Sequence, residues 1–252
     1  MIKSKFSPLI IAFQLLTRLP TPQLQEITPL NLGRSLLYYP LVGLAIGLML
    51  AALNWLLFSA TIEVTAALVL ILWVIITGGL HLDGLGDSAD AWVGGYGDRK
   101  RTLEIMKDPY CGPAAVATIL LVLITKYAAI QHVTEYSQYL ALIVIPVLSR
   151  SFILVLFLTT PYVRQNGLGE SLATHLPRRQ AWLVVCGVAI LCVLLLQLAG
   201  LILLLSALLG FIVLRWWMLA RLNGTTGDTA GAMVELLEVM LLVSFSLFCI
   251  IE

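Results

Sequence analysis

Long apolar stretches alternate with short polar connections along almost the whole chain. Seven of these stretches are about as long as a helix needs to cross a bilayer, which is roughly 20 mostly apolar residues. They cover approximately 35–58, 64–82, 113–132, 138–160, 181–199, 201–219 and 231–250. The pattern therefore predicts an all-α fold, a polytopic membrane bundle with about seven transmembrane helices.

The division between the fifth and sixth stretches is the weakest, because only Ala199 and Gly200 interrupt an apolar run from 181 to 219. The basic residues test it. With the N-terminus inside, all of the 15 basic residues except Lys126 and Arg150 fall in or beside connections on the cytoplasmic side. This agreement with the positive-inside rule holds at every connection only if 181–219 is a hairpin. The sequence therefore predicts an inside N-terminus and an outside C-terminus.

The composition agrees with a single integral membrane domain over 1–252. Hydrophobic residues make up 60% of the chain and charged residues 12%, whereas an ordinary soluble protein is about 25% charged. The net charge of +1 says little about partners, and no basic run is long enough to suggest a nucleic-acid footprint. The four cysteines have no metal-binding spacing. Residues 1–33 are interpreted as a retained cytoplasmic or interfacial segment, because no small-residue cleavage site follows their apolar part.

The longer polar connections are all on the predicted cytoplasmic side, at 83–112, 161–180 and 220–230, whereas the outer turns are short. Region 83–112 carries both acidic and basic residues and is expected to be mainly connection rather than span. The sequence therefore predicts that the protein acts at the cytoplasmic face of the membrane.

An acidic cluster begins where the second apolar stretch ends, in GGLHLDGLGDSADAW. Asp83, Asp87 and Asp90 follow an i, i+4, i+7 spacing, which places them within about 60° of one another on a helix. Three carboxylates on one face repel each other unless a divalent cation lies between them, and Mg²⁺ commonly joins carboxylates to substrate phosphates. The alternative is a solvated helix start, where aspartates favour the positive end of the dipole. We expect a magnesium site here.

A second candidate is the loop and helix start RLNGTTGDTAGAMVELLEV. Gly224 and Gly227 would let backbone N–H groups approach an anion closely, and a Gly/Thr-rich loop that opens a helix suits phosphate binding. Asp228 and Glu235 are seven residues apart and therefore share a helical face. Ordinary loop and cap chemistry would also account for this composition.

Basic residues follow the acidic cluster in GDRKRTLEIMKDPYCGPAA. Arg99, Arg101 and Lys107 have the chemistry to hold diphosphate oxygens, arginine as a fork and lysine as a point charge. The same residues would also serve as simple positive-inside anchors.

Three titratable residues lie in or next to apolar stretches. Arg150 is near the middle of the fourth stretch, where a charge is costly, and this position predicts a role in a pocket. Lys126 is expected to extend its ammonium group to the membrane interface. His81 is either a catalytic residue or ligand, or an interfacial hydrogen-bonding residue.

Five motifs together resemble the cobalamin synthase family, also called the adenosylcobinamide-GDP ribazoletransferases. They are FQLLTRLP, GGLHLDGLGDSADAW, RTLEIMKD, RQNGLGE and GTTGDTAGAMVE, and the resemblance extends from Phe13 to about Glu238. One departure is KDPYCGPAA, where the family pattern leads us to expect arginine at Tyr110 and glycine at Ala115. This departure leaves the role of 109–115 open.

The resemblance implies a Mg²⁺-dependent enzyme of the bacterial cytoplasmic (inner) membrane, with its active site facing the cytoplasm. It would join adenosylcobinamide-GDP to α-ribazole or its 5′-phosphate and release GMP. Its partners would be these substrates and the lipid bilayer, with no nucleic acid, and a homo-oligomer is left open.

On this interpretation the candidate residues fall into two groups. The catalytic and metal-binding candidates are Asp83, Asp87, Asp90 and Asp228, with His81 as a further catalytic candidate. The substrate- and phosphate-binding candidates are Arg18, Arg99, Arg101, Lys107, Arg150, Gly227 and Glu235. Asp90 is either a ligand or a general base, and Asp228 either binds the metal or orients the nucleophile with Glu235.

Two other classes of protein share part of this pattern. The CDP-alcohol phosphotransferases also bind a diphosphate on aspartates at a membrane face, but Leu80 occupies the place of their first aspartate and no Ala-Arg pair follows Gly84. A transporter would place charges deep in several spans and often has repeated halves. Here only Lys126 and Arg150 lie deep, and the halves do not repeat.

Overall fold

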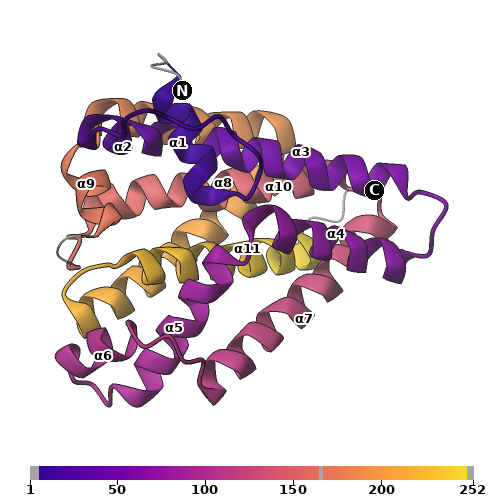
Figure 1. Cartoon of the computed structure of the whole chain (residues 1–252). Coiled ribbons are helices and arrows are strands. Elements are labelled where there is room, and N and C mark those ends of the chain that lie inside the picture. Colours follow the sequence, from indigo (N-terminus) through magenta and orange to yellow (C-terminus); the bar gives the residue numbers. More distant parts are fainter. Residues whose placement is uncertain (1–5, 165–166, 249–252) are drawn as a thin grey trace.

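The computed structural model describes residues 6–164 and 167–248, and these residues form a bundle of helices (Figure 1). An isolated parallel bridge pairs Tyr162 with Thr225, and no extended strand lies within this part of the chain. The all-α prediction is therefore confirmed. The helices are α1 (Ser7–Leu16), α2 (Pro29–Ser35), η1 (Leu36–Tyr38), α3 (Tyr39–Leu56), α4 (Ile62–Thr77), α5 (Leu80–Gly94), α6 (Arg99–Ile105), α7 (Pro113–Glu135), α8 (Tyr139–Thr159), α9 (Leu168–Thr174), α10 (Arg178–Leu222) and α11 (Gly227–Phe248).

The predicted second span requires a correction, because the helix does not continue from 64 to 82. Gly78 and Gly79 take positive φ angles of 63° and 68°, a conformation that glycine adopts without strain and that ends α4 at Thr77. The chain turns by 86° between α4 and α5. The acidic cluster therefore lies on a helix of its own, and region 83–112, expected to be mainly connection, is largely helical in α5 and α6.

The predicted hairpin at 181–219 is present within α10. The helix has 45 residues and is interrupted at Gln197, whose φ and ψ of 50° and −121° are not helical. A Cβ atom on Gly200 would lie 2.3 Å from the carbonyl oxygen of Cys192, so the chain folds back on itself at this turn. The two arms, orange and gold in Figure 1, are separate rods. The break lies at Gln197 rather than at Gly200.

Among the described residues, five helices are long and apolar enough to cross a membrane, and the bent pair α4–α5 provides a sixth span if it is counted as one. This count takes α10 as a single helix. Its two arms, counted separately, bring the total to the predicted seven.

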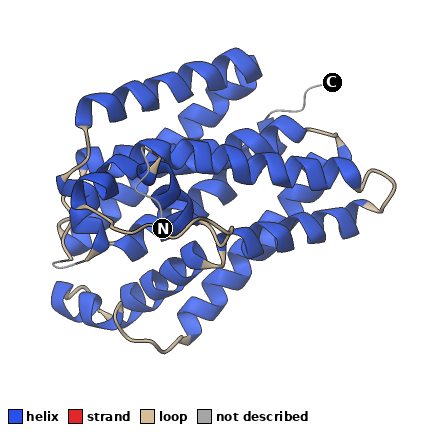
Figure 2. Ribbon diagram, turned by 45° about the horizontal axis from the view of Figure 1, so that its top comes forward, coloured by secondary structure: helices blue, strands red, loops and turns tan. Residues whose placement is uncertain are grey.

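Helix α11 is at the centre of the bundle (Figure 1), and α5, α7, α8 and α10 all pack against it. Figure 2 shows the helices of the bundle and the loops that join them. Its contact with α5 is very close, because the Cβ that Gly84 lacks would lie 2.7 Å from the carbonyl oxygen of Asp228. A Cβ on Gly231 would lie 3.4 Å from the Cα atom of His81. The two helices therefore run antiparallel with little space between them, and this fixes how their side chains meet.

Candidate active site

Acidic side chains from α5 and α11 meet at the end of the bundle where α11 begins. Asp87 is half-buried, and Asp83, Asp228 and Asp90 are all close enough to act on it electrostatically. Asp83 is exposed to solvent and Asp228 is half-buried. The structure therefore brings together carboxylates that the sequence places about 140 residues apart.

Asp90 is the member of the cluster whose oxygens are already occupied. Its Oδ2 accepts a hydrogen bond from the backbone N–H of Gly112 at 2.6 Å, and its Oδ1 accepts one from that of Ala115 at 2.9 Å. These N–H groups belong to the first turn of α7, where unpaired donors and the helix dipole favour a carboxylate. Asp90 therefore links α5 to the start of α7 through these two hydrogen bonds.

The predicted set of four aspartate ligands is not assembled. Within 6–164 and 167–248, no three His, Cys, Asp or Glu side chains are arranged closely enough to hold a metal ion by themselves. The carboxylates present are sufficient for an ion that the protein holds only in part. Mg²⁺ is usually held by one or two carboxylates, with phosphate oxygens and water completing its octahedron. Asp83, Asp87 and Asp228 supply hard oxygen donors of that kind.

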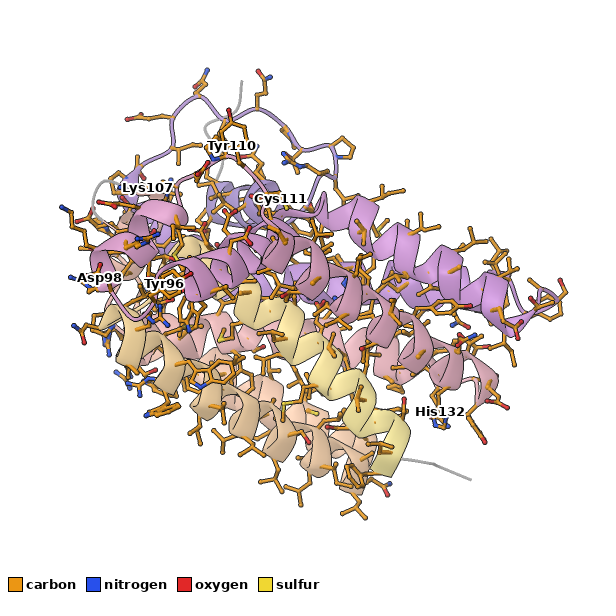
Figure 3. All side chains as sticks on the ribbon, turned by 90° about the horizontal axis from the view of Figure 1, so that it is seen from below. Tyr96, Asp98, Lys107, Tyr110, Cys111 and His132 are labelled. Atoms are coloured by element: carbon orange, nitrogen blue, oxygen red, sulfur yellow. The ribbon has the colours of Figure 1, made fainter. Side chains whose placement is uncertain are left out.

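A polar cavity of about 440 Å³ opens beside Asp228. It lies between α6, the segment that follows α8, and the start of α11, and its lining residues are Arg99, Leu103, Met106, Lys107, Val163, Arg164, Thr226 and Asp228. In the view from below in Figure 3, Lys107 lies at one end of the bundle and His132 at the other. The lining thus includes three cationic side chains, those of Arg99, Lys107 and Arg164. Binding of a phosphate or diphosphate requires cationic groups of this kind.

Arg164 is the residue that the sequence analysis missed. Its Nη1 donates a hydrogen bond to Asp228 Oδ2 at 2.9 Å, and this ion pair is partly exposed to solvent. The pair is held in place because Val163 and Thr225 are hydrogen-bonded through their backbones, N–H to carbonyl, at 3.0 Å. The only sequence signal was its place in RQNGLGE, where a lone arginine in a polar connection was interpreted as a topological anchor.

Most of the polar groups at the start of α11 already make hydrogen bonds within the protein. Thr226 and Thr229 cap the helix reciprocally, with backbone-to-hydroxyl distances of 2.9 and 3.2 Å. The Tyr162 hydroxyl oxygen accepts a hydrogen bond from the Gly227 backbone, while burial raises the pKa of Tyr162 above its usual value. Gly227, predicted to bind phosphate through its N–H, therefore already has a partner. The charge that faces an anion comes mainly from side chains.

The other predicted anion-binding residues are placed differently. Arg99 lines the cavity, and its Nε also donates to the carbonyl oxygen of Leu222 at 2.7 Å, at the end of α10. Arg101 lies over the ring of Tyr96, outside the cavity lining. Arg18 is exposed and lies against Gly78 at the bend between α4 and α5. Of the predicted basic residues, Arg99 and Lys107 share the cavity with Asp228.

Arg150 and Glu235 belong to a different group of side chains, deep in the bundle. Arg150 forms an ion pair with Glu238, and Lys126 Nζ lies 2.6 Å from Glu235 Oε2 and also contacts Glu238. We call these four side chains the buried ion cluster. The prediction that Lys126 extends to the interface is wrong, because this side chain is 2% exposed. A pocket role for Arg150 and phosphate binding by Glu235 are not supported by their positions, because neither residue lines the polar cavity.

His81 lies near the buried ion cluster rather than on the acidic face of α5. It is buried, and both Arg150 and Lys126 are close enough to act on it electrostatically. Its Nδ1 has no hydrogen-bond partner among the described residues. This position separates His81 from the exposed Asp83, although the two residues are neighbours on the same helix.

Comparisons with known proteins agree on one family. A family model described as cobalamin-5-phosphate synthase matches residues 8–246. A relative from Pseudomonas fluorescens (strain Pf0-1), named adenosylcobinamide-GDP ribazoletransferase, is 53% identical over 96% of this chain and 99% of its own length. Relatives of the same name from Pseudomonas syringae pv. syringae (strain B728a) and Stutzerimonas stutzeri (strain A1501) are each 52% identical over 95% of this chain and 99% and 98% of their own lengths. No solved structure matches the chain.

Proposed function

Because the chain belongs to the cobalamin-5-phosphate synthase family, we propose that it is a membrane-embedded adenosylcobinamide-GDP ribazoletransferase. It joins adenosylcobinamide-GDP to α-ribazole or its 5′-phosphate, and it releases GMP. Relatives of that name match it over nearly the whole of both chains. We place it in the bacterial cytoplasmic membrane with the acidic site facing the cytoplasm, as the distribution of basic residues favours.

The observation that carries this proposal is the polar cavity in which Arg99, Lys107 and Arg164 surround Asp228. In the proposed reaction a ribose hydroxyl of the acceptor attacks the phosphorus that bears cobinamide. The bond from this phosphorus to the bridging oxygen breaks, and GMP leaves with that oxygen. Negative charge grows on the phosphate oxygens during this step, and cationic side chains fixed around them stabilise the transition state.

The carboxylates supply the complementary part of the site. Mg²⁺ would be held by one or two of Asp83, Asp87 and Asp228 together with diphosphate oxygens, and it would neutralise charge on the leaving phosphate. A carboxylate of this group that does not contact the ion can accept the hydroxyl proton. Arg164 keeps Asp228 oriented toward the cavity through their ion pair. Asp90 contributes by holding α5 against α7.

The experiment that tests the proposal measures GMP release by the purified protein in detergent or nanodiscs, with Mg²⁺ and both substrates but no ion gradient. We expect turnover by the wild type and a loss of about 10²- to 10³-fold in Asp83→Asn and Asp228→Asn. Glu104→Gln is the matched control, because Glu104 is an exposed acid on α6 outside the cavity lining. Near-normal turnover by Asp83→Asn, or no GMP release by the wild type, would contradict the proposed function and its site.

A further inference from the structure

A second cavity lies between α5, α7, α10 and α11. It has a volume of about 320 Å³, and its lining is almost entirely apolar: Leu85, Ser88, Ala89, Trp92, Val93, Ala114, Thr118, Leu214, Trp217, Met218, Thr229, Ala232, Met233 and Leu236. It adjoins the acidic site along both helices, because Ser88 follows Asp87 on α5 and Thr229 follows Asp228 on α11. We call it the apolar cavity.

We propose that the apolar cavity binds the aromatic base of the ribazole acceptor and so sets the specificity for that substrate. This inference rests on the proposed function. Ribazole is the riboside of a dimethylated benzimidazole, a flat apolar heterocycle with one ring nitrogen free to accept a hydrogen bond. A base held in this cavity leaves the ribose near Asp87 and Asp228, where its hydroxyl must react.

Ser88 supplies the polar contact that such a base needs. The residue is 8% exposed, lines the cavity, and its hydroxyl has no hydrogen-bond partner among the described residues. A buried hydroxyl without a partner is unfavourable, and a ligand with an acceptor nitrogen would satisfy it. A lipid acyl chain has no acceptor to offer. The unpaired hydroxyl therefore favours a heterocycle over a lipid tail.

The size and aromatic lining of the cavity agree with this occupant. Pockets for small molecules start at roughly 300 Å³ and are lined mainly by apolar and aromatic side chains, so this cavity is large enough for a bicyclic base. Trp92 and Trp217 provide ring faces for offset stacking. Arg221 lies 5.6 Å from the centroid of the Trp92 ring, an interaction that restricts the orientation of this ring.

The first test pairs a variant with a substrate analogue. Ser88→Ala should raise the KM for α-ribazole about three- to tenfold, as the loss of one hydrogen bond predicts. An indole analogue, in which C–H replaces the free ring nitrogen, should bind to the wild type about as weakly as α-ribazole binds to Ser88→Ala. The Ser88→Ala substitution should not weaken the binding of this analogue further. If Ser88→Ala weakens both compounds to the same extent, or neither, the proposed contact does not exist.

The second test fills the cavity. Ala89→Trp should raise the KM for α-ribazole more than tenfold while the KM for adenosylcobinamide-GDP stays within about twofold. The matched control is Val188→Trp, which places the same bulk in an apolar groove between α3, α8 and α10. An unchanged KM for α-ribazole in Ala89→Trp overturns the proposal. If this variant does not fold, the Ser88→Ala result decides, because that substitution removes only one oxygen.

Direct binding separates this proposal from the proposed function and from lipid occupancy. Saturation-transfer NMR with wild-type protein and α-ribazole alone should show contact through the aromatic protons, and Ala89→Trp should abolish it. GMP release by the wild type without these effects would leave the function standing and remove only the base site. Native mass spectrometry tests for a bound phospholipid. The base site would also be overturned if the wild type carries a phospholipid that is absent from Ala89→Trp and that α-ribazole does not displace.

Discussion

Helix α11 carries carboxylates in two regions, and these regions differ in whether the carboxylates form ion pairs. Near its start, Asp228 joins Asp83 and Asp87, and within the described part of the chain the only cation paired with these three is Arg164. Two turns further along, Glu235 and Glu238 are buried, and each is paired with a cation. Among the described residues, only Asp228 forms an ion pair in the first region, whereas in the second both carboxylates do.

The difference follows from where each region lies. Inside an apolar bundle an unpaired charge is too costly to keep, so two carboxylates require two cations, here Lys126 and Arg150. Lys126 also lies 4.7 Å from the centroid of the Trp73 ring, which adds a favourable contact for the ammonium group. At the end of the bundle where α11 begins, Asp83 is exposed and Asp87 and Asp228 are half-buried, so water lowers the cost of unpaired carboxylates. The unpaired carboxylates there are therefore available to bind a ligand, whereas the paired charges in the interior hold helices together.

The largest effect should come from removing one charge of the buried ion cluster. Glu238→Gln leaves the Arg150 guanidinium buried without its carboxylate, and we expect a loss of about 3–5 kcal/mol in unfolding free energy. Thermal unfolding in detergent measures it, with Glu63→Gln at the exposed start of α4 as the control. The double variant Arg150→Met/Glu238→Leu should recover most of the stability, because Lys126 and Glu235 remain paired. Wild-type stability of Glu238→Gln would show that the pair is not a structural element.

A smaller effect is expected where charge faces the polar cavity. Arg164→Ala should lower kcat/KM for adenosylcobinamide-GDP by roughly ten- to a hundredfold with little change in stability, because the side chain is partly exposed. Arg164→Lys should recover part of the activity, since lysine keeps the charge but not the fork. Steady-state kinetics measure both variants.

Arg101→Ala is the control for Arg164, because Arg101 lies over Tyr96 and outside the cavity lining. We expect its kcat/KM to stay within about threefold of the wild type. If Arg101→Ala is as harmful as Arg164→Ala, the diphosphate binds outside the polar cavity.

The sequence predicts those features that depend on local pattern or on the sidedness of charge. Hydropathy identified α7, α8 and α11 to within a few residues, and the positions of basic residues divided 181–219 into two arms. The bend between α4 and α5 was missed, because Gly78 and Gly79 continue an apolar run and only their left-handed backbone ends the helix.

The contacts that define the site could not be predicted, because they join segments far apart in the chain. Arg164 meets Asp228 only through the pairing of two loops, and nothing near Arg164 in the sequence announces it. Asp90 looked like a third metal ligand by spacing, yet the start of α7 occupies both its oxygens. Arg150 was expected to have a role in a pocket, whereas its partner is Glu238, one helix away and 88 residues later in the chain.

The smallest effect concerns the stability of the acidic site and tests the magnesium ion without an activity assay. Asp87→Asn removes one of several carboxylates that repel each other, so in EDTA it should stabilise the protein by about 0.5 kcal/mol, a gain kept small by solvent screening. Mg²⁺ should raise the Tm of the wild type, because a ligand that binds only the folded state stabilises it. It should raise the Tm of Asp87→Asn much less. Glu104→Gln should follow the wild type in both conditions, since Glu104 is an exposed side chain that does not line the polar cavity. An equal Mg²⁺-dependent rise in the wild type and Asp87→Asn would place the ion elsewhere, and the unpaired carboxylates at this end of α11 would then need another explanation.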